Sequence, residues 1–234
     1  MPANATRRET AERFELALLS PATTRKDLDD GCRTARREGF AAVVVRPCDL
    51  RRCAEALDGS RTAAGTVVGF PHGGSTRAVK VHEAREAIED AQSVLGSKGP
   101  PVELDLVANA GRVLSGDWGA VRDEIQAVLD VTHARGGLVK AVIEVGHLAE
   151  EHLRRFCELC GELGADFIAV GTGFGPREAG VEDVRLVRQH LPAGVKVKAT
   201  ADSAGPAGVH SLLDAGVARI GTPRATAVLD AFNR

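Results

Sequence analysis

Short apolar runs alternate along the chain with longer stretches in which apolar residues recur every three or four positions. Eight short runs are recognisable, and most are rich in valine and bounded by glycine, proline or polar residues, as strands are. We expect strands at residues 15–19, 41–45, 66–70, 103–107, 138–143, 167–171, 195–199 and 219–221. Because small aliphatic residues dominate these runs, they indicate parallel strands buried on both faces.

The intervening stretches have the spacing of amphipathic helices. In three of them the apolar positions fall on one helical face: Val81, Ala84, Ile88 and Ala91; Val121, Ile125, Val128 and Leu129; Leu153, Phe156, Cys160 and Leu163. Thr24 and Asp27 have the spacing of a capping box at a helix start. Thr222 followed by Pro223 predicts a hydroxyl cap before a helix with proline in its first turn.

Eight strand–helix repeats within 234 residues favour a closed α/β structure, the (β/α)8 or TIM barrel. We expect residues 1–234 to form this barrel as one domain, since no stretch resembles a domain linker. An open, doubly wound sheet is the rival fold. It would need a glycine-rich phosphate turn after an early strand, and the sequence has no such turn there.

Side chains alternate across a strand, so the position of each residue assigns it to one face of the sheet. This alternation directs Asp105, Lys140, Ala169 and Lys198 into the barrel from four consecutive strands. Buried lysines are rare unless they are paired, so the cluster is either a structural ion network or a functional site. We favour a functional site, because catalytic groups of this fold lie at the carboxyl ends of the strands.

The chemistry that fits these residues is amine catalysis. A lysine near another cation in a dry pocket has a lowered pKa and is partly neutral near pH 7. Such an amine attacks a carbonyl carbon to form a Schiff base, which draws electrons from the adjacent carbon–carbon bond. A carboxylate such as Asp105 then moves protons during the intermediate steps.

At these residues the chain resembles the deoxyribose-phosphate aldolases, class I aldolases with a (β/α)8 barrel. The resemblance runs from about residue 14 to residue 221. Its marks are LLSP at 18–21, VVGFPHG at 67–73, ELDLV at 103–107, VKAVIE at 139–144, ADFIAVGTGF at 165–174 and VKA at 197–199. The family cleaves 2-deoxyribose 5-phosphate to acetaldehyde and glyceraldehyde 3-phosphate.

The resemblance implies roles for the interior residues. In the family the lysine on the sixth strand forms the Schiff base, and Ala169 stands at its position here. Asp105 matches the family's proton-transfer aspartate. Lys198 matches the seventh-strand lysine that perturbs the reactive amine, and Lys140 matches the fifth-strand lysine. The resemblance implies no cofactor and no metal.

Residues around the expected substrate also depart from the family. A Gly-Gly pair that binds phosphate through backbone N–H groups is replaced by TAD at 200–202, and Pro223-Arg224 follows the eighth strand. The carboxylate of Asp202 disfavours a phosphate dianion, and Arg224 either offsets it or pairs with it. Further candidate substrate contacts are His72, after the third strand, and Gly171, Thr172 and Gly173, after the sixth.

Three functions fit this pattern. In the first, Lys198, or failing it Lys140, has become the reactive amine of an aldolase-like carbon–carbon lyase or condensing enzyme. Its substrate is then a small aldehyde or keto compound, not phosphorylated at the usual end. In the second, the enzyme uses general acid–base chemistry without a Schiff base. In the third, the chain is an inactive barrel that binds a metabolite or a partner. We favour the first, because Asp105 and Lys198 are retained.

Composition narrows the partners. The net charge is −2 with the signs interspersed, and aromatic residues make up 3% of the chain, which argues against a nucleic-acid groove and a membrane surface. No apolar stretch approaches membrane-spanning length, and MPANATRR at the start precedes no signal-peptide run. We expect a small-molecule substrate and a homodimer.

The five cysteines favour a reducing cytoplasm, since the number is odd and a chain of this size needs no disulfides. Cys157 and Cys160 form a Cys-x-x-Cys, but they fall on the apolar face of a helix. We therefore expect them to pack in the core and not to bind zinc. His147 and His152 lack the spacing of metal ligands, so no metal is predicted.

Overall fold

The computed structural model describes residues 6–96 and 99–232. Within these ranges eight parallel strands close into a barrel in sequence order, so that β1 pairs with both β2 and β8. The strands are β1 (Phe14–Leu18), β2 (Ala42–Val45), β3 (Ala63–Val68), β4 (Glu103–Val107), β5 (Leu138–Ile143), β6 (Phe167–Val170), β7 (Lys196–Thr200) and β8 (Arg219–Thr222). The predicted (β/α)8 barrel is confirmed.

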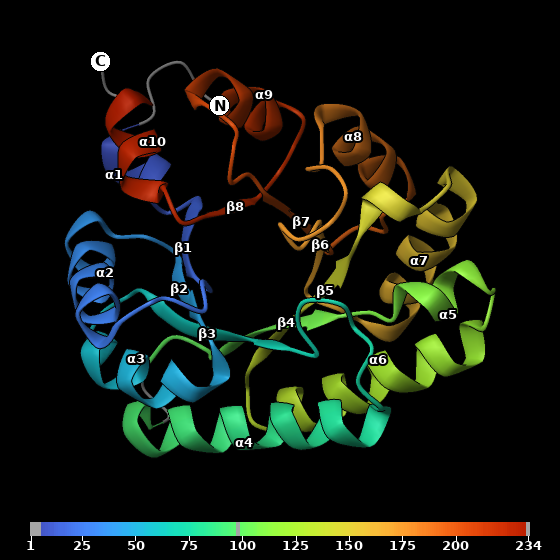
Figure 1. Ribbon diagram of the computed structural model, residues 1–234, viewed down its shortest axis with the longest axis horizontal. Coiled ribbons are helices and arrows are strands. Elements are labelled where there is room, and N and C mark those ends of the chain that lie inside the picture. The colour runs from blue at the N-terminus through green and yellow to red at the C-terminus, as the bar shows by residue number, and fades with distance from the viewer. Residues whose placement is uncertain (1–5, 97–98, 233–234) are drawn as a thin grey trace.

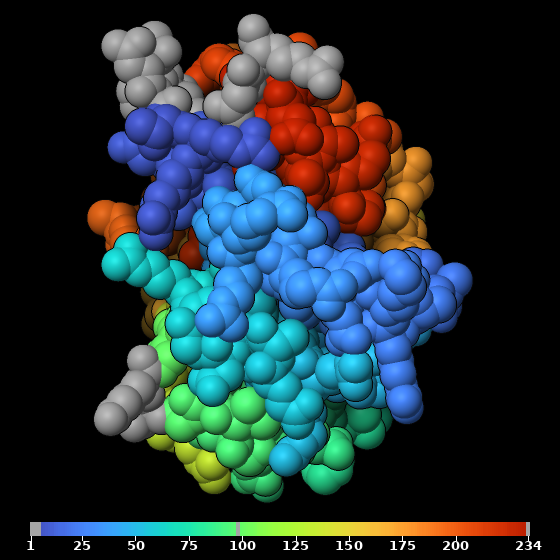
Figure 2. Space-filling model, turned by 90° about the vertical axis from the view of Figure 1, so that its left-hand side faces the viewer, coloured from blue at the N-terminus to red at the C-terminus, as the bar shows by residue number. Residues whose placement is uncertain are grey.

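Helices surround the barrel (Figure 1). They are α1 (Arg7–Ala11), α2 (Arg25–Glu38), α3 (Leu50–Leu57), α4 (Arg77–Leu95), α5 (Ala110–Leu114), α6 (Trp118–His133), α7 (Glu150–Leu163), α8 (Val181–His190), α9 (Pro206–Asp214) and α10 (Ala225–Phe232). Two short 3₁₀ helices, η1 (Pro47–Asp49) and η2 (Val145–His147), follow β2 and β5. Figure 2 shows α1 and α10 side by side, so the beginning and the end of the described chain meet on the outside of the barrel.

The third strand differs most from its expected position. It begins at Ala63, three residues before the expected start, because Ala63, Ala64 and Gly65 give little hydrophobic signal although they are buried and paired with β2. It ends at Val68. The next residue, Gly69, has a φ of 68°, in the left-handed region that ends an extended strand.

The two predicted helix starts have different outcomes. Thr24 caps α2 in a capping box with Asp27, as predicted. Thr222 is instead the last residue of β8, and α10 begins only at Ala225. The Thr222 hydroxyl accepts a hydrogen bond from the backbone N–H of Arg224 (3.2 Å), so it closes the turn that leads into the helix.

The apolar core lies mainly between the outer face of the barrel and the helices. Cys157 and Cys160 belong to it as free, buried thiols, and the prediction that they pack in the core is confirmed. Burial raises the pKa of Cys157 to about 12. A smaller apolar cluster, formed by Val107, Val142 and Ala169, lies inside the barrel.

In the described part of the chain no helix is long and apolar enough to cross a membrane. The prediction about the start of the chain falls partly on residues 1–5, which lie outside the described residues.

Candidate active site

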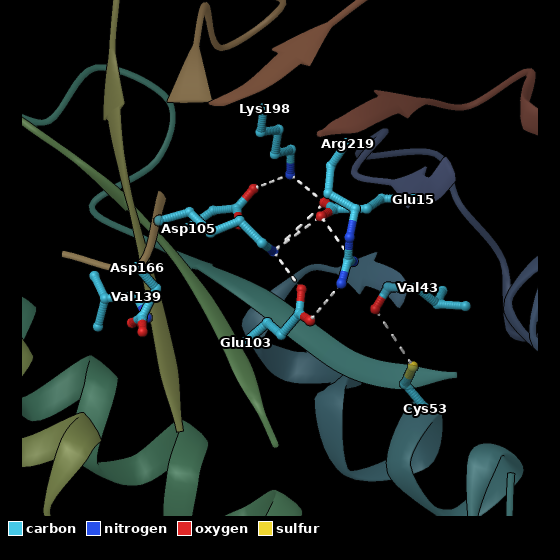
Figure 3. Close-up of polar contacts among 10 residues, drawn as sticks. Glu15, Val43, Cys53, Glu103, Asp105, Val139, Asp166, Lys198 and Arg219 are labelled. Atoms are coloured by element: carbon cyan, nitrogen blue, oxygen red, sulfur yellow. Dashed lines mark hydrogen bonds and ion pairs between the residues drawn. The ribbon is translucent and has the colours of Figure 1, made fainter. Parts of the chain in front are cut away.

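Six charged side chains meet inside the barrel, and we call them the ion cluster. They are Glu15 on β1, Glu103 and Asp105 on β4, Lys140 on β5, Lys198 on β7 and Arg219 on β8. With every group ionised, the three carboxylates balance the three cations. Figure 3 shows Lys198, Asp105 and Glu15 pointing toward one another from three different strands.

Lys198 lies between two carboxylates. Its Nζ is 2.5 Å from a carboxylate oxygen of Glu15 and contacts Asp105 on the other side, and its side chain is only 5% exposed. Ala169 is its partner residue on β6, so a methyl group lies next to the lysine where a longer side chain would otherwise compete for space. The nearest charged partners of Lys198 are therefore carboxylates and not the second lysine that the sequence had suggested.

Lys140 lies deeper in the barrel and is fully buried. Its Nζ is 2.7 Å from Glu103, 3.0 Å from Asp105 and 3.3 Å from Glu15. Burial acts to lower the pKa of Lys140, but the charges of Asp105, Glu103 and Glu15 outweigh it and raise this pKa above its usual range. The lowered pKa expected of a reactive amine therefore does not apply to Lys140, because three carboxylates surround it.

Above the ion cluster a cavity of about 240 Å³ opens at the carboxyl ends of the strands. Its walls are mostly apolar: Ala17, Leu18, Leu19, Val44, Val67, Phe70, Val142, Ala169, Phe174 and Pro223. Its other lining residues are Ser20, Thr23, Asp105, Gly171, Thr172, Lys198, Thr200, Asp202 and Gly221. Among the described residues that line it, Lys198 is the one basic side chain. One amine and two carboxylates, those of Asp105 and Asp202, therefore face a small, largely apolar chamber.

The loop after β6 is fixed by Glu144, at the end of β5. A carboxylate oxygen of Glu144 accepts the backbone N–H of Thr172 (3.0 Å) and its hydroxyl (2.7 Å). The N–H of Gly171 donates to the carbonyl oxygen of Ile143 (2.9 Å). These N–H groups are used within the chain, so they are not available to the anion that the sequence led us to expect at this loop.

The remaining predicted substrate residues have different positions. Asp202 lines the cavity, and Gly173 lies against it, since a Cβ placed on Gly173 would be 3.0 Å from the Asp202 carboxylate. Arg224 is exposed and donates to the carbonyl oxygen of Ala204 (3.3 Å). His72 is exposed, and neither it nor Arg224 is among the lining residues.

The chain is similar to known proteins over most of its length. No protein-family model matches the chain. A deoxyribose-phosphate aldolase of Rhodopirellula baltica is 38% identical over 221 residues, which cover 94% of this chain and 88% of the relative. The chain belongs to the deoxyribose-phosphate aldolase family. It is therefore an aldolase, and aldolases are carbon–carbon lyases.

Solved structures agree with this family. The aldolase QR15 superposes with a TM-score of 0.85 at 30% identity and covers 96% of both chains. A tetrameric deoxyribose-phosphate aldolase from Aeropyrum pernix has a TM-score of 0.84 at 27% identity, over 97% of this chain and 92% of its own. The barrel of this chain is thus the barrel of the aldolase family over nearly its whole length.

Sequence reasoning named only half of the ion cluster. Glu15, Glu103 and Arg219 were not identified as partners of the lysines, although alternation along β4 already directed Glu103 into the barrel together with Asp105. Alternation along β5 likewise directed Glu144 inward, and that was the available signal for its contact with Thr172. Glu15 and Arg219 meet only because β1 pairs with β8 when the barrel closes.

Proposed function

We propose that this aldolase makes or breaks a carbon–carbon bond next to the carbonyl of a small aldehyde or ketone, with Lys198 as its reactive amine. The observation that carries the proposal is the position of Lys198. It is the basic side chain that faces the cavity, it contacts Asp105, and it lies beside Ala169. The resemblance places the family's Schiff-base lysine at Ala169, so the chemistry requires another amine.

The amine is released by a proton transfer within the ion cluster. The Lys198 ammonium gives a proton to Asp105, with which it is in direct contact. Both groups become neutral, so the three negative and three positive charges become two and two, and the cluster stays balanced. A transfer that leaves no uncompensated charge costs less in a buried site than one that does.

The neutral amine then attacks the carbonyl carbon of the substrate. Asp105 returns its proton to the hydroxyl of the resulting carbinolamine, water leaves, and a protonated Schiff base forms. Its positive charge lies where the ammonium lay, between Asp105 and Glu15. The carboxylates that hold the ammonium therefore also stabilise the cationic intermediate.

The Schiff base accepts the electron pair of the neighbouring carbon–carbon bond when that bond breaks. One fragment leaves as an aldehyde after its hydroxyl proton passes to a base, the role we assign to Asp105. The other remains on Lys198 as an enamine. Protonation of the enamine carbon and hydrolysis release it and restore the amine. Condensation runs the same steps in reverse.

Lys140 acts as the electrostatic partner in this scheme. It contacts Asp105 and Glu15 from below, on the side away from the cavity, and it is not among the lining residues. Its positive charge remains beside Asp105 and Glu15 while Lys198 changes between ammonium, amine and Schiff base and Asp105 takes up and returns a proton. Lys140 is thus a positioning residue, and Lys198 and Asp105 are the proposed catalytic pair.

Borohydride trapping tests the role of Lys198. The protein is reduced in the presence of acetaldehyde or acetone, and the labelled lysine is located by peptide mass mapping. We expect the label on Lys198 and none after Lys198→Met or Lys198→Arg, with the fold checked by circular dichroism. Lys196 is the matched control, because it lies on the same strand, exposed, with its ammonium 5.4 Å from the centre of the Phe167 ring. A label on Lys140, or none on any interior lysine, would overturn the proposal.

A second candidate function follows from the two carboxylates around Lys198. They favour a lysine that stays charged and, with Asp105, catalyses proton transfer at the carbon next to a carbonyl without a Schiff base. Exchange of that carbon's protons in D₂O, measured by NMR, separates the two. This candidate is supported if proton exchange persists in Lys198→Arg and borohydride traps no product. Absence of both trapping and exchange supports an inactive, metabolite-binding barrel.

We also propose that the protein works as a homo-oligomer in the cytoplasm. A reducing compartment is consistent with five free cysteines, four of them buried. The Aeropyrum pernix aldolase is described as a tetramer. This supports self-association of the chain and makes a tetramer the alternative to the expected homodimer. Light scattering after size-exclusion chromatography measures the mass of the particle and decides between monomer, dimer and tetramer.

A further inference from the structure

The cavity has a second charged group besides the ion cluster. Asp202 lies two residues beyond the end of β7, whereas Lys198 lies within that strand. Two residues of strand from Lys198 to Thr200 rise by about 7 Å. Asp202 thus faces the cavity nearer its mouth, while the Lys198–Asp105 pair lies at its floor.

Asp202 has an unfilled hydrogen-bonding requirement. Its Oδ1 is buried, and within the described residues no donor reaches it. Arg224, the nearest candidate in the sequence, donates to the carbonyl oxygen of Ala204. Burial and the nearby charge of Glu178 both raise the pKa of Asp202. Asp202 also lines the cavity, so a ligand there can donate a hydrogen bond to this carboxylate, which the chain itself leaves without a complete set of donors.

The same part of the cavity has little to offer an anion. On the β6 side, the donors of Gly171 and Thr172 are used by Ile143 and Glu144. A phosphate or carboxylate there would face the Asp202 carboxylate without these N–H groups to offset the repulsion.

The β7–β8 side is similar. The N–H of Ala201 donates to the carbonyl of Gly221 (3.0 Å), and the N–H of Ser203 donates to Glu178 (2.7 Å). Pro223 has no N–H at all. On these two sides the backbone donors of Gly171, Thr172, Ala201 and Ser203 are thus engaged within the chain, and the charged side chain that lines the cavity there is an acceptor, Asp202.

The walls between floor and mouth are apolar. Phe70 and Phe174 form an edge-to-face pair with ring centres 5.2 Å apart, and both line the cavity together with Leu18. Such walls suit a short carbon chain that carries polar groups at its ends.

We propose that Asp202 selects substrates whose end remote from the carbonyl carries a hydrogen-bond donor, a hydroxyl or an ammonium group, and no phosphate or carboxylate. This rests on the proposed function, because the carbonyl end is taken to react with Lys198. Asp202 is then the residue that sets the specificity of the site, and the substrate is a short, non-anionic hydroxyaldehyde or aminoaldehyde.

Four aldehydes with three-carbon chains test the proposal: propanal, glyceraldehyde, 3-aminopropanal and glyceraldehyde 3-phosphate. Borohydride trapping at Lys198 is measured as a function of the concentration of each. In the unmodified protein, glyceraldehyde or 3-aminopropanal should half-saturate trapping at a concentration about tenfold lower than glyceraldehyde 3-phosphate, as expected for a hydrogen bond to a charged acceptor. The proposal would be overturned if glyceraldehyde 3-phosphate had the lowest half-saturating concentration, or if all four compounds had the same one.

Asp202→Asn identifies the donor. If the ligand group is an ammonium, the half-saturating concentration of 3-aminopropanal should rise about tenfold. That of glyceraldehyde should change little, because only the charge has been removed. If it is a hydroxyl, the half-saturating concentration of glyceraldehyde should rise toward that of propanal, and that of glyceraldehyde 3-phosphate should fall. Glu178→Gln is the matched control, since it removes a neighbouring charge outside the cavity lining, and it should leave the ranking unchanged. A ranking that Asp202→Asn does not alter contradicts the proposal.

Binding of the same four compounds to Lys198→Met, followed by ligand-observed NMR, separates this proposal from the proposed function. That variant cannot form a Schiff base. If it retains the preference for the hydroxyl or ammonium compound, Asp202 acts as proposed even where trapping has failed. If trapping succeeds at Lys198 but no preference exists in either protein, the proposed function stands and the role of Asp202 is refuted.

Discussion

Lys140 is the most deeply placed cation of the ion cluster. Its side chain is fully buried, and its ammonium contacts three carboxylates, those of Glu15, Glu103 and Asp105. Removing water from a charge is costly, and the cost is offset only when partners surround it closely. The three carboxylates depend on Lys140 in the same way, because without it they would face two cations.

We therefore expect Lys140→Met to lower the free energy of unfolding by about 3–5 kcal/mol, the cost of leaving buried carboxylates unpaired. Urea titration followed by circular dichroism measures the change. Lys196→Met removes the same charge from an exposed position on β7 and should cost at most about 0.5 kcal/mol. Equal effects of the two substitutions would show that Lys140 is not held by its carboxylates.

Between elements, a second buried ion pair joins α4 and α6 to the barrel. The Nζ of Lys80 on α4 is 2.9 Å from Glu124 on α6, and it also donates to the carbonyl oxygen of Val107, at the end of β4 (2.7 Å). Glu124 in turn accepts the backbone N–H of Asn109 (3.3 Å). The Lys80–Glu124 pair thus connects two helices with the end of β4 and the loop that follows it. Asp105 lies on the same strand.

The pair predicts a large cost for Lys80→Met, about 3 kcal/mol or more, because Glu124 would remain buried without its cation. The same two helices provide a control. Arg77 and Asp123 are 3.7 Å apart and both more than 60% exposed, so Arg77→Met should cost less than about 1 kcal/mol. Adding Glu124→Leu to Lys80→Met should restore part of the stability. No recovery in the double variant, measured by urea titration, would contradict the ion-pair explanation.

At the scale of the whole molecule, strand and helix periodicities were sufficient to predict the barrel, and alternation within single strands was sufficient to direct Asp105, Lys140 and Lys198 inward. Both are local properties of a sequence. The contact of Glu15 with Lys198 is not local, because it crosses the interior and exists only once β1 has paired with β8. The charge balance of the interior could therefore not be read from any one segment.

Side-chain directions in loops and on one helix face were also not predictable from the sequence. His72 and Arg224 follow strands and were expected at the cavity, but the loop backbone directs both to the surface. No periodicity governs side-chain direction once a strand has ended. Lys80 was missed for a related reason: it lies in a helix rich in charged residues, where one buried lysine has the same sequence appearance as an exposed one.

The closed ion cluster also determines how the stability of the whole barrel responds to acid. Glu15 is fully buried, and burial alone would raise its pKa, but the charges of Lys140, Lys198 and Arg219 outweigh this and lower the pKa to about 2. The unfolded chain has a glutamate pKa near 4.5, so Glu15 contributes its stabilisation fully above pH 4.5 and loses it as the pH falls from 4.5 toward 2. The difference corresponds to a contribution on the order of 3 kcal/mol.

Unfolding free energies measured in urea at pH 7, 4 and 3 should fall across this interval. They should fall less steeply in Glu15→Gln, which is already weakened at pH 7, whereas Glu86→Gln, at an exposed position of α4, should follow the unmodified protein. A Glu15→Gln curve parallel to that of the unmodified protein would mean that Glu15 is not ionised in the folded barrel. The balance of three carboxylates and three cations would then be wrong.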